Sequence, residues 1–300
     1  MNITVIGTAF VDIKGHSKNK YIEGGRNPGY IENAYGGVAR NIAEDLINAG
    51  ISSSFVSMAD DSATGKALLD GLISKGINTD HVGICPSGCG TWLAVFNELG
   101  DVVASISVKA DLSGLPALID EHHEEIFSNT DAIILEIDID EQIVDRVFKY
   151  AKIYGLDVYC AVAIMSNALD KKKYLSGAKC FICNAQEAGM LLGHELQGSS
   201  ADETLQYAIS LREKTGCENL VITMAGNGSV YAGANGEHGI CPAESVKLVD
   251  STGAGDSYCA GLSAALASGL PLSEACRIGT KMAASVVSGT ENVYTGPKLF

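Results

Sequence analysis

The sequence predicts an α/β fold in three layers, with a mostly parallel central sheet covered by helices on both sides and a small β-sheet lid at one end. Two observations support this fold class. Short apolar runs typical of buried strands alternate with segments of helical period along most of the chain, which is the pattern of a parallel sheet. Two β-rich pieces, at about 13–35 and 82–108, interrupt this alternation, and we expect them to form the lid.

Length and composition fit a single domain that spans residues 1–300. Of the 300 residues 46% are hydrophobic, which is enough for a large core. The net charge of −15 argues against a nucleic-acid partner, because phosphate backbones bind clustered Lys and Arg. The first residues lack the features of a signal peptide, and no apolar run approaches the ~20 residues that cross a bilayer. We therefore expect a cytoplasmic protein without a membrane partner, whose nine scattered cysteines are reduced.

The first elements follow from the spacing of apolar residues. A helix is predicted to begin after Gly36-Gly37 and to end at Gly50, because a set of apolar residues falls on one of its faces. That set is Val38, Ile42, Leu46 and Ala49. The other elements predicted in this part are strands at 2–8 and 53–58 and a helix at about 64–74.

The remaining elements begin with a β-hairpin. Its strands are expected at 91–96 and 102–108, on either side of an Asn97-Glu98-Leu99-Gly100-Asp101 turn. Alternation then resumes, and the strands predicted from it are 132–137, 157–162, 179–183 and 219–223. Smaller hairpin signals follow near 229–231 and 239–241, and helices starting near Gly255 and Leu272 close the chain.

The most specific stretch is Asp250-Ser251-Thr252-Gly253-Ala254-Gly255-Asp256, which precedes a small-residue, apolar segment of helical character. Gly253 and Gly255 let the backbone turn tightly and approach a ligand, and free N–H groups at a helix start bind anions. Asp256 would repel a phosphate there unless it had a task, and taking the proton from an attacking hydroxyl is such a task. The stretch therefore predicts a phosphoryl-transfer site with Asp256 as base. The alternative is a turn whose acidic residue complements the helix dipole.

A second group of residues is suited to a polyhydroxy acceptor. Gly36 and Gly37 allow a ligand to lie against backbone amides, and Asn41 offers donors and acceptors to hydroxyls. Asp12 follows the first strand, where ligands gather in open parallel sheets, and its carboxylate can accept from two vicinal hydroxyls. Arg40 is either a solvated helix residue or a donor to a substrate carbonyl. A plain turn at the glycines and a local backbone bond from Asn41 remain as alternatives.

Two further strand ends carry polar residues. Asn184 and Glu187 have the spacing of an N-cap and its capping-box partner, and they are also suited to Mg²⁺ held through water near phosphates. Thr223, Gly226 and Gly228 follow another strand, where they could admit a nucleotide or form a hairpin turn.

A pair of carboxylates ends the strand predicted at 132–137. Glu136 and Asp138 point toward the same edge of the sheet as the other candidate residues. They are either solvated loop carboxylates or, in the case of Glu136, a substrate contact.

Together these motifs resemble the ribokinase-like (PfkB) family of sugar and nucleoside kinases, and the resemblance covers nearly the whole chain in the right order. The stretch 250–256 resembles the second family signature, and Gly36-Gly37-x-x-x-Asn41 resembles the first. Asn184-x-x-Glu187 resembles the motif that organises magnesium and phosphate, and Thr223-x-x-Gly226-x-Gly228 resembles the nucleotide loop.

The resemblance implies ATP as phosphate donor, Mg²⁺, a core sheet of about nine strands and a homodimer formed through the β-lid. It also implies the role of each matching residue: Asp256 as base, Gly253, Ala254 and Gly255 as anion hole, Asp12 and Asn41 as ligands of acceptor hydroxyls, and Asn184 and Glu187 as the magnesium site. Asp250 and Ser251 lie where many members of the family bind K⁺. One departure stands out. After the strand at 157–160 many relatives have an acidic residue followed by Pro or Asn, whereas this chain has Cys160-Ala161-Val162-Ala163.

The predicted function is transfer of the ATP γ-phosphate to a hydroxyl of a sugar or nucleoside. Pseudouridine is the favoured acceptor, because Asn27-Pro28-Gly29 ahead of Gly-Gly-Val-Ala-Arg-Asn resembles pseudouridine kinases. The alternatives are a kinase of a free sugar such as ribose or fructose, and a non-catalytic sugar or nucleoside sensor on the same fold. A dinucleotide-binding oxidoreductase is disfavoured, because Gly7-Thr8-Ala9-Phe10 after the first strand lacks the glycine fingerprint.

Overall fold

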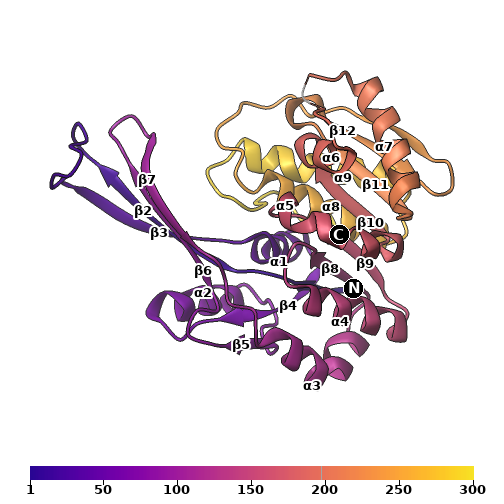
Figure 1. The fold of residues 1–300 in the computed structure, drawn as a ribbon, viewed down its shortest axis with the longest axis horizontal. Helices are drawn as coiled ribbons and strands as arrows, with labels where there is room; N and C mark the ends of the chain where they lie inside the picture. The colour runs from indigo at the N-terminus through magenta and orange to yellow at the C-terminus, as the bar shows by residue number, and fades with distance from the viewer. Residues whose placement is uncertain (197) are drawn as a thin grey trace.

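The computed structural model describes residues 1–196 and 198–300 and has two parts, a main α/β body and an arm of long strands that projects from it (Figure 1). Within the described residues, the body contains a nine-stranded sheet in the order β13-β12-β11-β10-β9-β8-β1-β4-β5. Its strands are β1 (Asn2–Ile6), β4 (Ser52–Ala59), β5 (Val82–Ile84), β8 (Ala132–Glu136), β9 (Asp157–Ala161), β10 (Cys180–Asn184), β11 (Asn219–Thr223), β12 (Ser229–Gly233) and β13 (His238–Cys241). All neighbouring pairs are parallel up to β11, and the β11–β12 and β12–β13 pairs are antiparallel. The predicted mostly parallel sheet is confirmed.

Helices cover both faces of this sheet. The α-helices are α1 (Val38–Ala49), α2 (Ala63–Ser74), α3 (Leu115–Ser128), α4 (Glu141–Tyr154), α5 (Met165–Ala168), α6 (Ala185–Leu192), α7 (Ala201–Thr215), α8 (Ala254–Ala267) and α9 (Leu272–Val287). Two short 3₁₀ helices, η1 (Leu169–Gly177) and η2 (Ala225–Asn227), complete the set. No helix in the described part of the chain is both long and apolar enough to cross a membrane.

Two hydrophobic cores explain the three layers. Successive residues of a strand face opposite sides, and β1 places Val5 in one core and Ile6 in the other. The first core lies between the sheet and α1, α2, α8 and α9, and the second lies between the sheet and α3, α4 and α7. A strand with apolar residues on both faces is stable only between two helical layers, which is why the continuous apolar runs predicted this architecture correctly.

The projecting arm is a four-stranded, mostly antiparallel sheet in the order β3-β2-β6-β7. Its strands are β2 (Phe10–Ser17), β3 (Gly29–Gly36), β6 (Gly90–Phe96) and β7 (Val102–Val108). The two lid segments expected outside the α/β alternation therefore do form a separate small sheet.

One strand within the expected lid range belongs elsewhere. Residues 82–84 form β5, which pairs in parallel with Ser57–Ala59 of β4 at the edge of the large sheet. The backbone N–H of Cys85 continues this pairing by donating to the carbonyl of Ala59 at 2.9 Å. A three-residue strand is too short for its sequence to show which sheet it joins, and the neighbouring strand decides. All nine cysteines are free thiols, as expected.

Candidate active site

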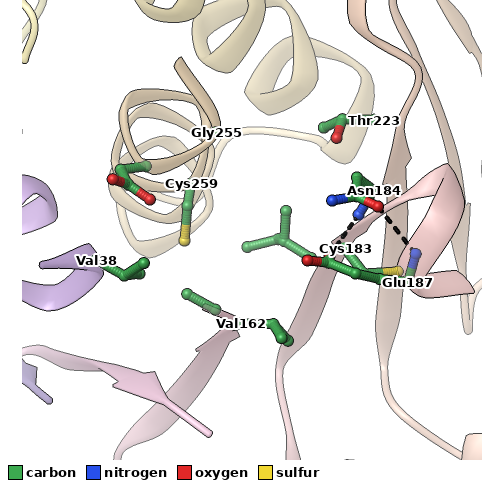
Figure 2. A pocket seen from close by; sticks show the side chains of 11 residues that line it. Val38, Val162, Cys183, Asn184, Glu187, Thr223, Gly255 and Cys259 are labelled. Carbon is green, nitrogen blue, oxygen red and sulfur yellow. Dashed lines mark hydrogen bonds between the residues drawn. The ribbon is translucent and has the colours of Figure 1, made fainter. Parts of the chain in front are cut away.

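The candidate residues meet at the carboxyl ends of the parallel strands, around an open pocket. Strands β9, β10 and β11 provide one wall, and α1 and the start of α8 provide the other (Figure 2). The lining residues are Val38, Ala161, Val162, Ile182, Cys183, Asn184, Glu187, Thr223, Gly255, Asp256 and Cys259. Open parallel sheets bind ligands at this edge, because strand ends and helix starts expose polar groups there together.

The turn before α8 is shaped by Gly253. This residue has φ +79°, and a Cβ added to it would lie 1.8 Å from the carbonyl oxygen of Asn292. The first bond of α8 runs from Ser257 N–H to the Gly253 carbonyl at 2.9 Å, so the amides of Gly255 and Asp256 precede the helical ladder. Amides in this position, at the positive end of the helix dipole, suit an anion.

Asp256 is the carboxylate at this helix start. Its Oδ2 accepts a hydrogen bond of 2.7 Å from Nδ2 of Asn41 on α1, and the side chain is partly exposed to the pocket. Burial raises the pKa of Asp256 to about 7, and the carboxylate of Glu187 raises it further, whereas the Asn41 amide and the Arg40 guanidinium lower it. Asp256 is thus a carboxylate poised to take up a proton near neutral pH.

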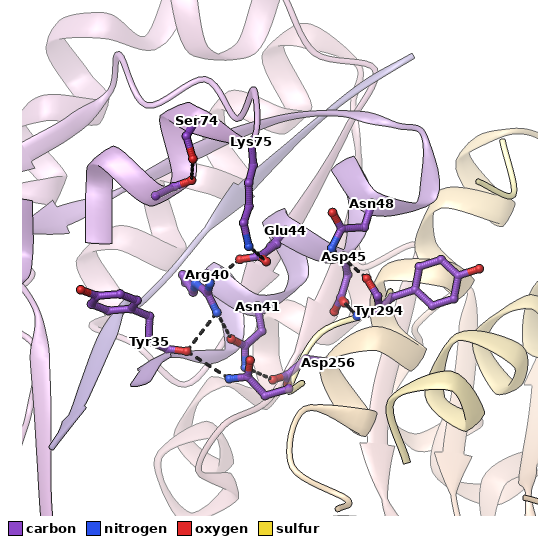
Figure 3. A network of polar contacts seen from close by, with 12 residues as sticks. Tyr35, Arg40, Asn41, Glu44, Asp45, Asn48, Ser74, Lys75, Asp256 and Tyr294 are labelled. Carbon is purple, nitrogen blue, oxygen red and sulfur yellow. Dashed lines mark hydrogen bonds and ion pairs between the residues drawn. The ribbon is translucent and has the colours of Figure 1, made fainter. Parts of the chain in front are cut away.

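Arg40 lies in an internal network beside Asp256 (Figure 3). Its guanidinium donates to the Tyr35 carbonyl and to Oδ1 of Asn41, both at 3.0 Å, and forms an ion pair with Glu44. Lys75 also pairs with Glu44. Among residues 1–196 and 198–300, Nε of Arg40 has no hydrogen-bond partner. The side chain is buried, so the solvated alternative for Arg40 is wrong, and its contact with a substrate stays a prediction.

Asp45, one turn further along α1, connects three parts of the chain. Its Oδ1 accepts from the Ser257 hydroxyl at 2.9 Å and from the Tyr294 backbone N–H at 2.5 Å. Complete burial raises the pKa of Asp45 well above its usual value. This network fixes α1, α8 and the C-terminal segment relative to one another, and it holds Asp256 in place through its neighbour Ser257 (Figure 3).

Asn184 and Glu187 form the predicted capping box at the start of α6. Glu187 N–H donates to Oδ1 of Asn184 at 2.9 Å, and Asn184 N–H donates to Oε2 of Glu187 at 2.8 Å (Figure 2). Burial and the nearby Asp138 carboxylate raise the pKa of Glu187, although the bond from Asn184 lowers it. Glu187, Asn184 and Asp256 all line the pocket, and their oxygens are a donor set that fits Mg²⁺, which prefers oxygen ligands.

The residues predicted to form a nucleotide loop lie at and after the end of β11. Thr223 lines the pocket, whereas Gly226 and Gly228 belong to the turn that joins β11 to β12. Met224 N–H donates to the Gly228 carbonyl at 2.7 Å, as in the hairpin-turn alternative. Gly228 has φ +86°, and a Cβ there would lie 2.1 Å from the Cys241 carbonyl oxygen. The turn alone therefore explains Gly228, and open space around Gly226 leaves room for a ligand.

The acceptor-side candidates surround the base of the lid. Gly37 has φ +99° and caps α1, and a Cβ added to it would lie 2.6 Å from the Thr8 carbonyl oxygen. Asp12 on β2 pairs in register with Ala34, and its carboxylate lies beside Gly36 at the end of β3. Burial raises the pKa of Asp12, while Lys14 lowers it.

Glu136 and Asp138 are buried, so the solvated alternative for both is wrong. Glu136 accepts from the backbone N–H of Thr8 at 2.8 Å and from its hydroxyl, which ties β8 to the end of β1. Burial raises the pKa of Glu136 to about 7, helped by the charge of Asp138. Asp138 accepts from the backbone amides of Ala163 at 2.8 Å and Ile164 at 3.0 Å. It therefore fixes the segment after β9, where many relatives have an acidic residue and this chain does not.

The expected K⁺ residues lie in the exposed part of the loop. Oδ1 of Asp250 accepts from the Thr252 N–H at 2.8 Å, and this bond lowers the pKa of Asp250. Ser251 provides the carbonyl that receives Ala254 N–H at 3.2 Å. Both residues order the turn into α8, and their role in K⁺ binding stays a prediction.

Sequence reasoning missed the residues that complete the site from a distance. Asp45 and the C-terminal segment around Asn292 shape the start of α8, and Val162 and Cys259 line the pocket. Asp45 follows Asn41 by four residues, so it lies on the same side of α1, and this spacing was the available signal. The C-terminal contacts left no local pattern in the sequence.

The comparisons with known proteins show which class of enzyme has this fold and pocket: a kinase of sugars or nucleosides, a phosphotransferase that acts on an alcohol group. The family model described as pfkB family carbohydrate kinase matches residues 1–297, and the chain belongs to this family. It is similar to guanosine-inosine kinase of Exiguobacterium acetylicum, with 32% identity over 97% of this chain and 95% of that protein. It is also similar to pseudouridine kinase of Escherichia coli, with 25% identity over 92% of this chain and 87% of that protein.

Solved structures show the same fold. Ribokinase of Arabidopsis thaliana, in complex with ribose and ATP, matches with a TM-score of 0.81 and 20% identity, over 99% of this chain and 95% of that chain. A carbohydrate kinase from Agrobacterium tumefaciens matches with a TM-score of 0.82 and 22% identity, over 99% of this chain and 94% of that chain. The predicted ribokinase-like fold and kinase class are confirmed.

Proposed function

We propose that this protein is an ATP-dependent nucleoside kinase in which Asp256 is the general base. The observation that carries the chemistry is a carboxylate with a pKa of about 7 at the start of α8, beside amides free to bind an anion. A hydroxyl placed against Asp256 would lose its proton as it attacks the γ-phosphorus in line with the leaving ADP. The amides of Gly253 and Gly255 would stabilise the charge that develops on the phosphoryl oxygens, whereas the Ala254 amide, also predicted for this role, already donates to the Ser251 carbonyl.

Asn184 and Glu187 would hold Mg²⁺ through water at the opposite wall of the pocket, with Thr223 near the phosphates. When bound, Mg²⁺ screens the charge of the phosphates during transfer. Asp138 supports this wall by fixing the backbone of residues 163–164 next to the pocket. It thereby supplies a carboxylate near the place where the chain lacks the acidic residue after β9.

The lid supports a nucleoside rather than a free sugar as acceptor. The strand register places His16 opposite both Tyr30 and Phe96, and the His16 ring stacks on each, with centroids 4.8 and 4.7 Å apart. Trp92 lies opposite Asp12 and packs its ring edge-on against Phe96. Alternation puts all of these rings on one face of the lid, together with Asp12. Aromatic rings beside a hydroxyl-binding carboxylate suit a base and its ribose.

We infer that this aromatic face is directed toward the loop before α8. Lys14 lies between Asp12 and His16 on β2 and shares their face of the sheet. Its ammonium lowers the pKa of Asp250, so it lies within electrostatic reach of the loop before α8. A nucleobase bound on the lid and a hydroxyl bound at Asp256 would then belong to one ligand that extends from the lid to α8.

Within the nucleosides, pseudouridine is the favoured acceptor and guanosine or inosine is the second candidate. The Asn27-Pro28-Gly29 and Arg40 signals support pseudouridine, and the higher identity to a guanosine-inosine kinase supports the purines. Arg40 does not distinguish the two, because its Nε is buried, and a base carbonyl would reach this atom only after the guanidinium turns toward the ligand.

The test is ATP consumption with Mg²⁺ over pseudouridine, uridine, inosine, guanosine, adenosine, ribose and fructose. We expect turnover on a nucleoside. A preference for free sugar would keep the Asp256 chemistry and reject the nucleoside assignment. No turnover with any of these compounds would favour a non-catalytic sugar or nucleoside sensor. In parallel, Trp92→Leu should raise KM for the nucleoside by about tenfold or more, since base stacking contributes ~1–3 kcal/mol. Ile153→Ala, at an exposed position on α4 away from the lid, should leave KM unchanged.

We further propose that the protein acts in the cytoplasm as a homodimer and binds K⁺ near Asp250 and Ser251. Nine free thiols suit a reducing compartment. The outer face of the lid supports the dimer, because it carries the exposed apolar side chains Ile31, Leu93, Ile106 and Val108. Replacing K⁺ by Na⁺ in the assay tests the cation site, and equal rates in both salts would reject it.

A further inference from the structure

A cluster of metal-binding side chains lies at the edge of the large sheet, apart from the active site. His81 ends the connection between α2 and β5, and His122 and Glu125 lie on α3. Figure 1 shows α3 beside β5 at the end of the body that is remote from β12 and α7. None of the three residues lines the active-site pocket. We propose that His81, His122 and Glu125 form a binding site for a divalent transition metal of the Zn²⁺ type.

The distances fit tetrahedral coordination. Nε2 of His81 lies 3.1 Å and Nδ1 of His122 lies 3.7 Å from Oε2 of Glu125, and one donor atom from each residue falls within 4.8 Å of the others. Ligand atoms about 2.0–2.1 Å from Zn²⁺ at tetrahedral angles are about 3.3 Å apart. The two imidazole centroids are 5.4 Å apart and tilted by 58°, so both rings can direct a nitrogen to one point. Small side-chain rotations would bring all three donors to bonding distance.

The backbone of α3 separates this cluster from the neighbouring histidine. His122 departs from helical geometry, with φ −110° and ψ 18°, in the middle of the helix. His123 turns to the other side, where it stacks on Tyr150 with centroids 4.5 Å apart and bonds Tyr154 Oη at 3.0 Å. Two adjacent residues of the same type therefore have different surroundings, and only His122 shares Glu125 with His81.

The surroundings favour a cation and leave room for a fourth ligand. A solvent-filled hollow beside the cluster is lined by Glu121, His122, Glu124, Glu125, Ser128 and Asn129. Its carboxylates attract a cation, and a water can complete the coordination. Two imidazoles with one carboxylate favour Zn²⁺, Co²⁺ or Ni²⁺ over Mg²⁺ and Ca²⁺, which prefer oxygen ligands. The ion proposed here is thus distinct from the Mg²⁺ of the active site.

A bound ion would fasten the edge of the sheet. Strand β5 is short, pairs only with β4 among the described strands, and carries His81 directly before its first residue. Coordination by α3 would tie this edge to the helical layer, and an ion that binds only the folded chain stabilises it by mass action.

The site is tested on the full chain, stripped with chelator and kept free of nucleotide, by titration with Co²⁺ and with Zn²⁺. We expect one equivalent of Co²⁺ with visible absorption of nitrogen and oxygen ligation, and a rise in Tm with Zn²⁺. His122→Ala and Glu125→Gln should each weaken Zn²⁺ binding by about tenfold or more and abolish the rise in Tm. His123→Ala is the matched control and should keep the affinity of the wild type.

The competing outcomes are distinguishable. Near-ultraviolet thiolate-to-Co²⁺ absorption that persists in Glu125→Gln would assign binding to cysteine and overturn the proposal. Equal affinity of the His122 and His123 variants, or no binding by the wild type, would also overturn it. Far-ultraviolet circular dichroism and Mg²⁺-dependent kinase activity of each variant show that the fold is intact, because none of these residues belongs to the active site.

Discussion

At the scale of single residues, Asp256 and Glu136 show how two carboxylates with similar pKa values have different roles. Burial brings the pKa of both to about 7, but Glu136 is engaged by Thr8, whereas Asp256 faces the pocket with one hydrogen bond, from Asn41. Asp256→Asn should therefore lower kcat by about 10²–10⁴-fold, because the amide cannot accept the proton, while nucleotide still binds. Steady-state kinetics with calorimetric titration of nucleotide measure both. Near-normal turnover in the variant would contradict the assignment of the base.

Asn41 sets the protonation of that base. Its amide donates to Asp256 and stabilises the carboxylate, so Asn41→Ala should raise the pKa of Asp256. The rising limb of the pH–kcat/KM profile, expected near pH 7 in the wild type, should move about one unit to higher pH. Asn48→Ala is the control, because Asn48 lies on the same helix and bonds the Tyr294 carbonyl instead. An unshifted profile for Asn41→Ala would rule out this coupling.

The same pKa shift has a consequence for stability. Asp256 has a folded pKa of about 7, above its unfolded value of 3.8, so the folded state binds this proton more tightly. The stabilisation that comes from binding this proton is therefore complete below about pH 4 and is lost as the pH rises to 7. Asp256→Asn should therefore exceed the wild type in free energy of unfolding by about 1–3 kcal/mol at pH 8, with a smaller excess at pH 5. Urea unfolding at both pH values checks this, and equal differences would contradict it.

At the scale of elements, the turn into α8 depends on Gly253. Gly253→Ala would meet both a left-handed backbone and the Asn292 carbonyl, whereas Gly269, with φ +82°, has open space around it. Gly269→Ala should therefore lower the free energy of unfolding by about 1 kcal/mol, because only the left-handed backbone conformation is strained. Gly253→Ala should lower the free energy of unfolding by about 2–4 kcal/mol and remove most of the activity. Thermal unfolding and turnover of the two variants separate backbone strain from steric conflict. Equal losses in both would show that the Asn292 contact is relieved without cost.

Most elements of the large sheet could be predicted because their signals are local. The apolar run at 219–223 and the glycines that end α1 mark elements without help from the rest of the chain. The placement of β5 and the buried role of Glu136 depend instead on residues far away in the sequence. A Glu at the end of a strand looks the same in the sequence whether it accepts a hydrogen bond from Thr8 or is solvated. Only the fold distinguishes the buried Glu from the solvated one. The site was predictable as a set of strand ends, and its supporting contacts were not.

At the scale of the whole molecule, the lid has two faces with different chemistry. The face that carries Asp12 bears the aromatic rings, and the opposite face bears apolar side chains that a second copy would cover. Its exposed side chains lie on the arm that projects from the body (Figure 1). The proposed substrate contacts and the proposed dimer contacts therefore lie on opposite faces of one small sheet.

Ile106→Glu places a charge on the outer face of the lid, where Ile106 is 67% exposed, and should convert the proposed dimer to a monomer. Ile153→Glu is the matched control, because Ile153 is 64% exposed on α4, away from the lid, and should leave the mass unchanged. Light scattering after size exclusion measures the mass of both. A wild type that is monomeric, or an Ile106→Glu variant that stays dimeric, would reject assembly through this face.

If each lid helps to order the other, Ile106→Glu should also raise KM for the acceptor, because a monomer must order its lid unaided when the ligand binds.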